Sequence, residues 1–169
     1  MGSSQNQALR LATFASGFLT LTASVAAAED LRGVVIAVST GSTLTVQGAD
    51  RRQHRIRLAA IDPPEKGQGF AESSRQHLAE LTLKKQAQLD CYRVDGSKRK
   101  VCRVLVNGRD VALAQIQAGL AWHYKRFEKE QTAGERAAYA RTEEQARAAR
   151  IGLWQSEKPV PPWEFRQRK

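Results

Sequence analysis

The sequence predicts a small closed β-barrel of five short strands with three helices packed against it. Three strand-like segments joined by tight turns come first in the folded part of the chain. A helical segment follows, then a hairpin of two further strands, then two more helical segments. Five strands are too few for a two-sheet sandwich, whereas they suffice to close a small barrel. We therefore expect an α+β domain built on a barrel.

The size and charge of the chain narrow its class. It has 169 residues, 41% of them hydrophobic, with 27 Lys and Arg against 17 Asp and Glu, a net charge of +10. This apolar content is too high for a disordered tail, and the chain is too short for two full-sized domains. No internal repeat of a solenoid period is visible. The positive charge favours an anionic partner, such as nucleic acid, a phosphorylated substrate or an acidic membrane surface.

The first three strands form an antiparallel meander. Residues 31–38 and 44–47 are predicted strands on either side of a Thr-Gly-Ser-Thr turn at 40–43. Basic and apolar residues alternate in the third strand, 51–61, before a continuous apolar end. Two prolines follow Asp62, so the chain must leave the sheet there as a loop.

Helices occupy most of the remaining chain. Residues 70–85 have apolar side chains at helical spacing, 110–119 carry an Asp cap and a Gly stop, and 132–151 form a long Ala-, Arg- and Glu-rich helix. The basic tail, 155–169, is predicted to be extended. Five antiparallel strands with three helices packed on them predict a five-stranded OB-fold over residues 29–154.

The two cysteines lie in the predicted hairpin. Strands around a turn between Gly96 and Ser97 place Cys91 directly opposite Cys102, within the range of a disulfide. A disulfide is the favoured interpretation in an oxidising compartment. A metal site is the weaker alternative, because no His or third Cys is close in sequence.

Residues 1–28 have the features of a signal peptide. Arg10 precedes an apolar, uncharged stretch that ends in an Ala-x-Ala site before Glu29. A retained membrane anchor is the alternative, but Ser and Thr interrupt the apolar stretch. Cleavage removes one arginine and no acid, so the net charge falls from +10 to +9. We expect a secreted or periplasmic protein with no stable membrane association after cleavage.

The segment around Asp62 carries the candidate chemistry. Arg57 lies five residues before Asp62 and Glu65 three after it, while the prolines at 63 and 64 restrict the backbone between the two acids. A guanidinium and two fixed carboxylates suit metal-assisted hydrolysis of a phosphodiester. Arg99, just after the hairpin turn, is the candidate second guanidinium. A surface ion pair is the alternative interpretation of this spacing.

Across most of its length the chain resembles the thermonuclease, or staphylococcal-nuclease-like, family. The resemblance runs from about 31 to 154 and includes Arg-x4-Asp-x-Pro-Glu at 57–65, the basic hairpin, Asn-Gly-Arg-Asp at 107–110 and Gly-Leu-Trp at 152–154. The cysteine pair and the Pro-Pro-Trp-Glu-Phe-Arg tail are similar to the exported bacterial branch. The resemblance implies a five-stranded barrel, a Ca²⁺-dependent nuclease and a DNA or RNA substrate.

The family's roles transfer to matching positions. Arg57 and Arg99 would clamp the phosphate, Glu65 would act as general base or position the water, and Asp62 would bind the metal together with the backbone carbonyl of Pro63. Ser42 stands where the family's first turn supplies a second metal-binding Asp. Because Ca²⁺ affinity falls with the number of charged ligands, we expect weakened Ca²⁺ binding, with another divalent cation as the alternative cofactor.

Basic and aromatic residues suggest a nucleic-acid surface. Basic side chains crowd the third strand and the hairpin, where they would form a groove that follows a phosphate backbone or would merely be solvated. Two aromatic side chains after the short helix could stack a base or pack on the barrel. The candidate binding residues are Arg55, Lys98, Lys100, Tyr124 and Phe127.

Two functions compete at this point. The leading hypothesis is an exported nuclease, and the alternative is a non-catalytic module that binds nucleic acid or another polyanion, which Ser42 favours. A protein scaffold has no positive sign in the sequence. We expect a monomer, and no protein partner is predicted.

Overall fold

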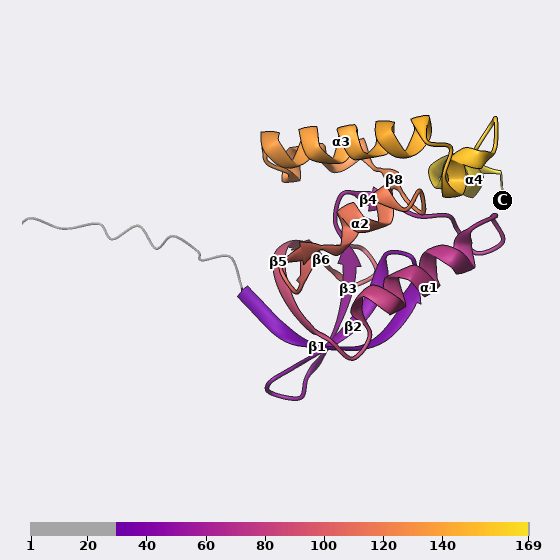
Figure 1. Cartoon of the computed structure of the whole chain (residues 1–169). Helices are drawn as coiled ribbons and strands as arrows, with labels where there is room; N and C mark the ends of the chain where they lie inside the picture. The colour runs from indigo at the N-terminus through magenta and orange to yellow at the C-terminus, as the bar shows by residue number, and fades with distance from the viewer. Residues whose placement is uncertain (1–29, 169) are drawn as a thin grey trace, which may run out of the picture.

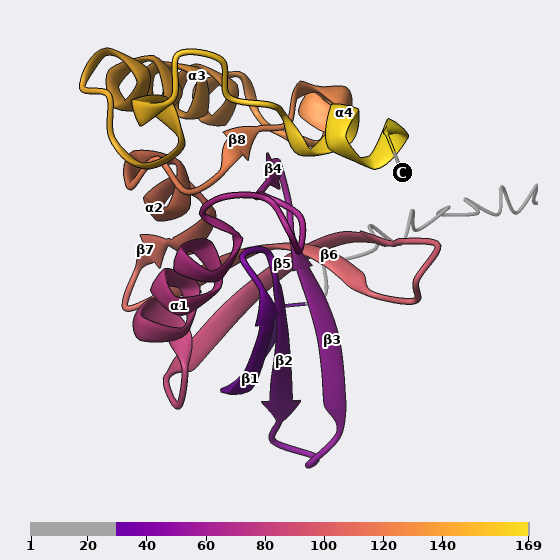
Figure 2. The ribbon, with the colours of Figure 1, turned by 90° about the vertical axis from the view of Figure 1, so that its right-hand side faces the viewer.

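The computed structural model describes residues 30–168, and the predicted signal peptide lies outside these residues. The expected five-stranded barrel is present. Its strands are β1 (Asp30–Thr40), β2 (Thr43–Gly48), β3 (Gln53–Leu58), β5 (Gln86–Val94) and β6 (Lys100–Val106). They pair in the order β3-β2-β1-β5-β6, and β3 closes the ring by pairing with β6 (Figures 1 and 2).

One strand pairing differs from the expectation. The strands were expected to be antiparallel throughout, but β3 and β6 run parallel, with Arg57 opposite Val101. The other four pairings of the ring are antiparallel. A closed ring with an odd number of strands cannot alternate in direction all the way round, so one parallel contact is unavoidable. This contact sets β3 beside the basic hairpin strand.

The third predicted strand is interrupted before its end. Strand β3 stops at Leu58, and Ala60 takes a left-handed conformation with φ of 62°. The chain then enters the two-residue strand β4 (Ile61–Asp62), which pairs with β8 (Trp122–His123). Asp62 was expected in a loop, but it lies in β4 and is followed by the loop. The kink redirects Asp62 towards the end of the barrel.

The core lies inside the barrel and beneath its helices. Inward-facing aliphatic side chains from all five strands are fully buried, among them Val35, Leu44, Ile56, Leu89 and Val104. Helix α1 (Ala71–Thr82) packs on β1, and α2 (Val111–Gln117) packs on β6. Helix α3 (Ala133–Ala148) lies on the far side of α2 from the strands (Figure 1).

The helix caps agree with the sequence signals. The carboxylate of Asp110 accepts hydrogen bonds from the backbone of Ala112 and Leu113 at the start of α2. Thr132 and Glu135 form a capping box at the start of α3. The remaining short elements are β7 (Arg109–Asp110) and the 3-10 helices η1 (Lys125–Glu130) and η2 (Gly152–Gln155).

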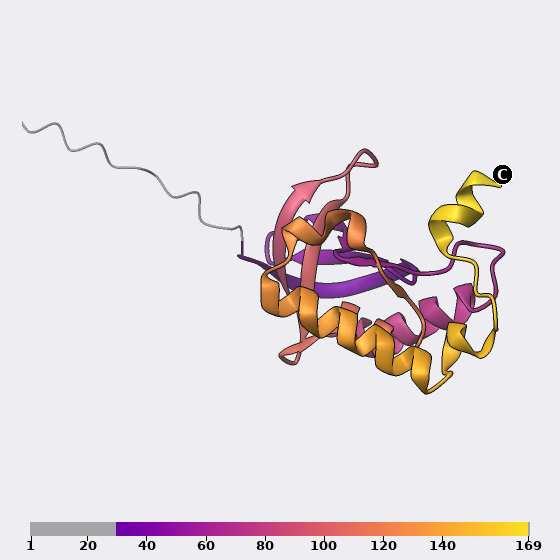
Figure 3. The same ribbon diagram turned by 90° about the horizontal axis from the view of Figure 1, so that it is seen from above.

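The expectation of an extended tail is wrong for its last residues. Residues Pro162–Gln167 form helix α4, with Pro161 as the N-cap and Pro162 as the first helical residue. Proline suits the first turn of a helix, where its fixed φ is already helical and its missing N–H has no partner to lose. In Figures 2 and 3, α4 lies beside the loop that follows β4. The tail therefore belongs to the surroundings of the candidate site. Within residues 30–168, no helix has the length and apolar character needed to span a bilayer.

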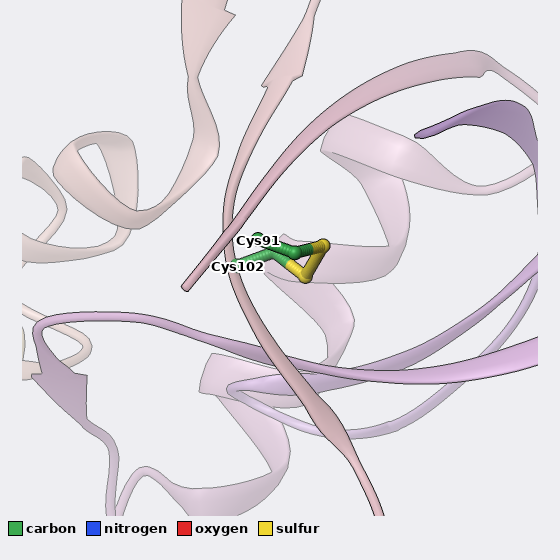
Figure 4. The surroundings of a disulfide bond; sticks show 2 residues. All are labelled: Cys91 and Cys102. Atoms are coloured by element: carbon green, nitrogen blue, oxygen red, sulfur yellow. A yellow bond between two sulfur atoms is a disulfide. The ribbon is translucent and has the colours of Figure 1, made fainter. Parts of the chain in front are cut away.

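The hairpin disulfide is present. Cys91 lies opposite Cys102 across β5 and β6, and their sulfur atoms are bonded (Figure 4). The Cα atoms are 4.0 Å apart, and Cys102 is fully buried. The bond fixes the base of the hairpin whose turn precedes Arg99.

Removing this disulfide should destabilise the domain. We expect the double variant Cys91→Ser/Cys102→Ser to lose about 2–3 kcal/mol of unfolding free energy, because the bond closes a short loop in the unfolded chain. Urea unfolding followed by circular dichroism measures the loss, with reduced wild-type protein as the control. An unchanged midpoint in the double variant would contradict the prediction.

Candidate active site

One pocket collects all the predicted catalytic and metal-binding residues. It has a volume of about 540 Å³ and lies where the β1–β2 turn, the loop after β4, the start of α1 and the hairpin turn meet. Its lining includes Ser42, Arg57, Asp62, Pro63, Glu65 and Arg99. These positions span 58 residues of sequence (42 to 99), and the barrel brings them together.

The loop after β4 positions the two carboxylates. The backbone N–H of Tyr124 donates to the carbonyl of Ala60 over 2.8 Å, which extends the β4–β8 pairing and fixes the kink. Asp62 is only 2% exposed, and the two prolines after it are buried. The backbone N–H of Glu65 donates to the side chain of Gln68 over 2.7 Å. Both acids are therefore held on a stiff segment, Asp62 inside the structure and Glu65 nearer the solvent.

The β1–β2 turn packs directly against this loop. A Cβ atom on Gly41 would lie 1.9 Å from the Ser74 hydroxyl oxygen and 2.8 Å from the Cβ of Pro63, so only glycine fits there. The buried side chain of Gln115 donates to the carbonyl of Gly41 over 2.8 Å. Ser42, which follows, is 4% exposed. Helix α2 thus anchors the turn that carries the serine in place of the expected acid.

Arg57 faces Asp62 across the kink. Its Nη2 lies 3.2 Å from Oδ1 of Asp62, and its side chain is 23% exposed. Arg57 projects outward from β3, on the same strand face as Arg55, while Ile56 and Leu58 point into the core. Arg57 therefore lies where the pocket meets the outer surface of β3.

Arg99 is held by the turn of its own hairpin. Its Nη2 and Nε lie 2.8 and 2.9 Å from Oδ2 of Asp95, and its Nη1 donates to the Thr43 hydroxyl over 3.2 Å. Burial alone would raise the pKa of Asp95, but hydrogen bonds from the side chain and backbone of Arg99 outweigh it and hold this pKa below its usual value. The contact with Thr43 ties the hairpin turn to β2, next to Ser42.

A third arginine reaches the two acids from the C-terminal helix. Arg166 of α4 places its Nη2 2.9 Å from Oδ2 of Asp62, and its Nη1 forms an ion pair with Oε1 of Glu65. The hydrogen bond to Asp62 is the main cause of a raised pKa of Arg166. Burial opposes this shift, and the hydrogen bond to Glu65 raises the pKa further. The sequence interpretation missed this residue. The helix-start signal of Pro-Pro before Trp-Glu-Phe-Arg could have found α4, but not its contact with residues about 100 positions earlier.

The predicted nucleic-acid residues lie outside this pocket. Arg55 and Lys98 are exposed, and the pairing of Ile56 with Lys100 sets the basic strands β3 and β6 side by side. Two other basic residues of the hairpin have structural partners, since Arg93 pairs with Glu130 and Arg103 pairs with Asp110 and Glu135. The basic surface therefore centres on β3 and the hairpin turn.

The predicted aromatic pair lies outside the first pocket, with Tyr124 beside α4. The ring centroid of Tyr124 is 5.4 Å from that of Trp163 and 5.8 Å from that of Phe127. Tyr124 lines a separate hollow, and the guanidinium of Arg93 covers the ring of Phe127 at 4.4 Å. Both aromatic residues thus make packing contacts, and neither lines the first pocket.

The chemistry of the pocket suits a hard cation. The side chains of Asp62 and Ser42 and the backbone of Pro63 offer only oxygen donors, which Ca²⁺ and Mg²⁺ prefer. In the part of the chain that the structure describes, no three His, Cys, Asp or Glu side chains cluster as a metal site. The guanidinium of Arg166 forms ion pairs with both Asp62 and Glu65, and so supplies a positive charge at this position. The residues therefore fit a cation, but with a single carboxylate from the expected ligand set.

The closed barrel, with arginines and carboxylates gathered at one end, places the chain among the OB-fold proteins. The chain belongs to the staphylococcal nuclease family, because the family model described as staphylococcal nuclease homologue matches residues 55–156, more than half of the sequence.

Relatives from bacteria and a plant are similar to the chain. A micrococcal nuclease of Shigella flexneri is 34% identical over 156 residues, 87% of each protein. An uncharacterized endonuclease of Haemophilus influenzae is 30% identical over 80% of this chain and 72% of the relative. An uncharacterized 38.1 kDa protein of Capnoides sempervirens is 37% identical over 70% of this chain, which spans only 33% of that relative. The family assignment predicted from the sequence is confirmed at this level.

Proposed function

We propose that the protein is an exported, metal-dependent nuclease that hydrolyses phosphodiester bonds of DNA, RNA or both. The observation that carries the proposal is the convergence of Arg57, Arg99, Asp62 and Glu65 on one pocket from three separate segments. Two arginines suit a phosphate, since the planar guanidinium matches its oxygens in pairs. The basic surface of β3 and the hairpin turn would guide the polyanion to this pocket.

In this proposal, different side chains of the pocket bind the phosphate, accept the proton and hold the metal. Arg57 and Arg99 bind the nonbridging oxygens of the phosphate and stabilise the negative charge that grows as the water attacks. Glu65 accepts a proton from the water. At the same time the water oxygen bonds to phosphorus, and the bond between phosphorus and the leaving oxygen breaks. The leaving oxygen takes its proton from solvent. A divalent cation held by Asp62, the Pro63 carbonyl and Ser42 would add positive charge beside the phosphate.

The export part of the proposal rests on two features. The signal-peptide pattern in residues 1–28 predicts passage across a membrane. The Cys91–Cys102 disulfide suits an oxidising compartment such as the periplasm or the exterior.

A degradation assay tests the nuclease proposal. Circular plasmid and a single-stranded RNA are incubated with the protein in Ca²⁺, Mg²⁺, Mn²⁺ or EDTA. We expect cleavage that requires a divalent cation, and loss of intact circles would identify internal cutting. Persistent substrate under every condition would reject the proposal.

The second candidate is a module that binds nucleic acid without cutting it. Two observations favour it. Ser42 supplies no charge where a metal-binding Asp is expected, and Arg166 forms ion pairs with both Asp62 and Glu65. Binding without cleavage in every metal would support this candidate over the nuclease.

Restoring the missing acid should strengthen metal binding. We expect Ser42→Asp to tighten Ca²⁺ binding about 10-fold or more, because a second carboxylate adds a charged ligand. Isothermal titration calorimetry measures the change. Ser39→Asp is the matched control, since Ser39 lines the same pocket and is exposed. Equal affinities for wild type and Ser42→Asp would contradict the assigned role of position 42.

A further inference from the structure

Both carboxylate oxygens of Asp62 are already bonded to guanidinium groups. Oδ1 lies 3.2 Å from Nη2 of Arg57 and 3.5 Å from Nη1 of Arg166. Oδ2 lies 2.9 Å from Nη2 of Arg166. Arg57 and Arg166 therefore share Oδ1, whereas Oδ2 is bonded to Arg166 of the C-terminal helix.

A cation bound to Asp62 would conflict with this arrangement. Ca²⁺ binds carboxylate oxygens at about 2.3–2.6 Å, and Asp62 is only 2% exposed, so little water reaches its carboxylate. A guanidinium hydrogen-bonded to the same oxygen would place two positive groups within a few ångströms of each other in a poorly solvated spot. The metal and the Arg166 contact with Asp62 are thus mutually exclusive.

We propose that Arg166 is an internal cation that occupies the acid pair of the site and must leave Asp62 before a divalent metal binds. This inference rests on the metal site of the proposed function. The side chain of Arg166 then acts as a latch on the metal site. The apparent metal affinity depends on how firmly this side chain is held as well as on Ser42. Competition of this kind weakens the apparent affinity by the fraction of molecules whose site is open.

The side chain of Arg166 can leave while its helix stays in place. It is 41% exposed, so water can replace its contacts. Helix α4 has other anchors, because the ring centroid of Trp163 lies 5.6 Å from that of Trp122 and 5.4 Å from that of Tyr124. The segment before α4 is also fixed, since the side chain of Gln68 donates to the carbonyl of Val160 over 3.0 Å. Rotation of one long side chain is therefore enough to open the site.

The test compares metal binding by two arginine variants, one within α4 and one at its C-terminal cap. Arg166→Gln removes the guanidinium from the acid pair. Arg168→Gln is the matched control, because it removes the same charge from the C-terminal cap of α4, at a position paired with Glu164 outside the pocket. Calorimetric titration with Ca²⁺ and with Mn²⁺, without nucleic acid, measures the affinity of each full-length protein. Circular dichroism and thermal melting confirm that each variant is folded.

We expect Arg166→Gln to bind the metal about 10-fold more tightly than wild type, and Arg168→Gln to match wild type within about twofold. Arg166→Lys, which keeps the charge but loses the planar fork, should give a smaller gain. Unchanged or weaker binding by Arg166→Gln, an equal gain in Arg168→Gln, or no metal binding by wild type and Arg166→Gln alike would each overturn the latch.

A cleavage assay on the same preparations separates this inference from the proposed function. Cleavage by wild type without tighter metal binding in Arg166→Gln would reject the latch and leave the nuclease standing. Tighter binding in Arg166→Gln, with no cleavage by any variant, would support the latch and reject the nuclease.

Discussion

Replacing Glu65 with glutamine should lower the rate of cleavage by a factor of about 10²–10⁴ with little change in nucleic-acid affinity. Glutamine has nearly the same shape but cannot accept a proton from the attacking water, and general-base catalysis contributes about this much. Glu65 is partly exposed at the pocket, so the substitution leaves the buried core untouched. Single-turnover cleavage of a labelled oligonucleotide measures the rate, and fluorescence anisotropy measures the affinity.

Glu72→Gln is the control for this substitution. Glu72 lines the same pocket and is paired with Arg75 on α1. Its removal takes the same charge from the pocket without touching the proposed base, so cleavage should stay within a few-fold of wild type. A Glu65→Gln protein that cleaves within tenfold of wild type would show that another group activates the water.

Replacing Arg57 with glutamine should cost a factor of about 10²–10³ in kcat, because one donor to the developing charge is lost. Arg57→Lys should recover only part of this loss, since an ammonium cannot form the paired contact of a guanidinium. Arg57→Gln also leaves Asp62 with Arg166 as its one guanidinium partner, so we expect a small loss of unfolding free energy in this variant. Steady-state kinetics and a urea titration measure the two effects separately.

Arg52→Gln controls for the loss of a positive charge near this strand. Arg52 lies five residues before Arg57, is exposed, and pairs with the nearby Asp50. If Arg57 only added positive charge to the surface, Arg52→Gln and Arg57→Gln would lower kcat/KM to the same extent, chiefly by raising KM. The proposed phosphate contact instead requires a loss in kcat that is specific to Arg57.

The close spacing of Arg57, Asp62 and Glu65 made their meeting predictable from sequence. Only eight positions separate Arg57 from Glu65, and the prolines restrict the path of the chain between the two acids. The opposition of Cys91 and Cys102 was predictable for a similar reason, because strand pairing around a short turn fixes the register. Local chain geometry decides both features.

Contacts across the fold were harder to predict. The kink at Ala60 depends on pairing with β8, about 60 residues later, and the parallel contact of β3 with β6 depends on barrel closure. Arg166 looked like one more basic residue of a basic tail, since its partners Asp62 and Glu65 lie far away in sequence. Such contacts depend on how α4 docks on the domain, which no local pattern encodes.

The most direct test is a crystal structure of the Glu65→Gln variant bound to a short oligonucleotide in Ca²⁺. We predict that one phosphate lies between Arg57 and Arg99, with the cation on Asp62 and the side chain of Arg166 turned away from that carboxylate. A phosphate bound elsewhere on the barrel, with Arg57 and Arg99 making no contact to it, would contradict the account.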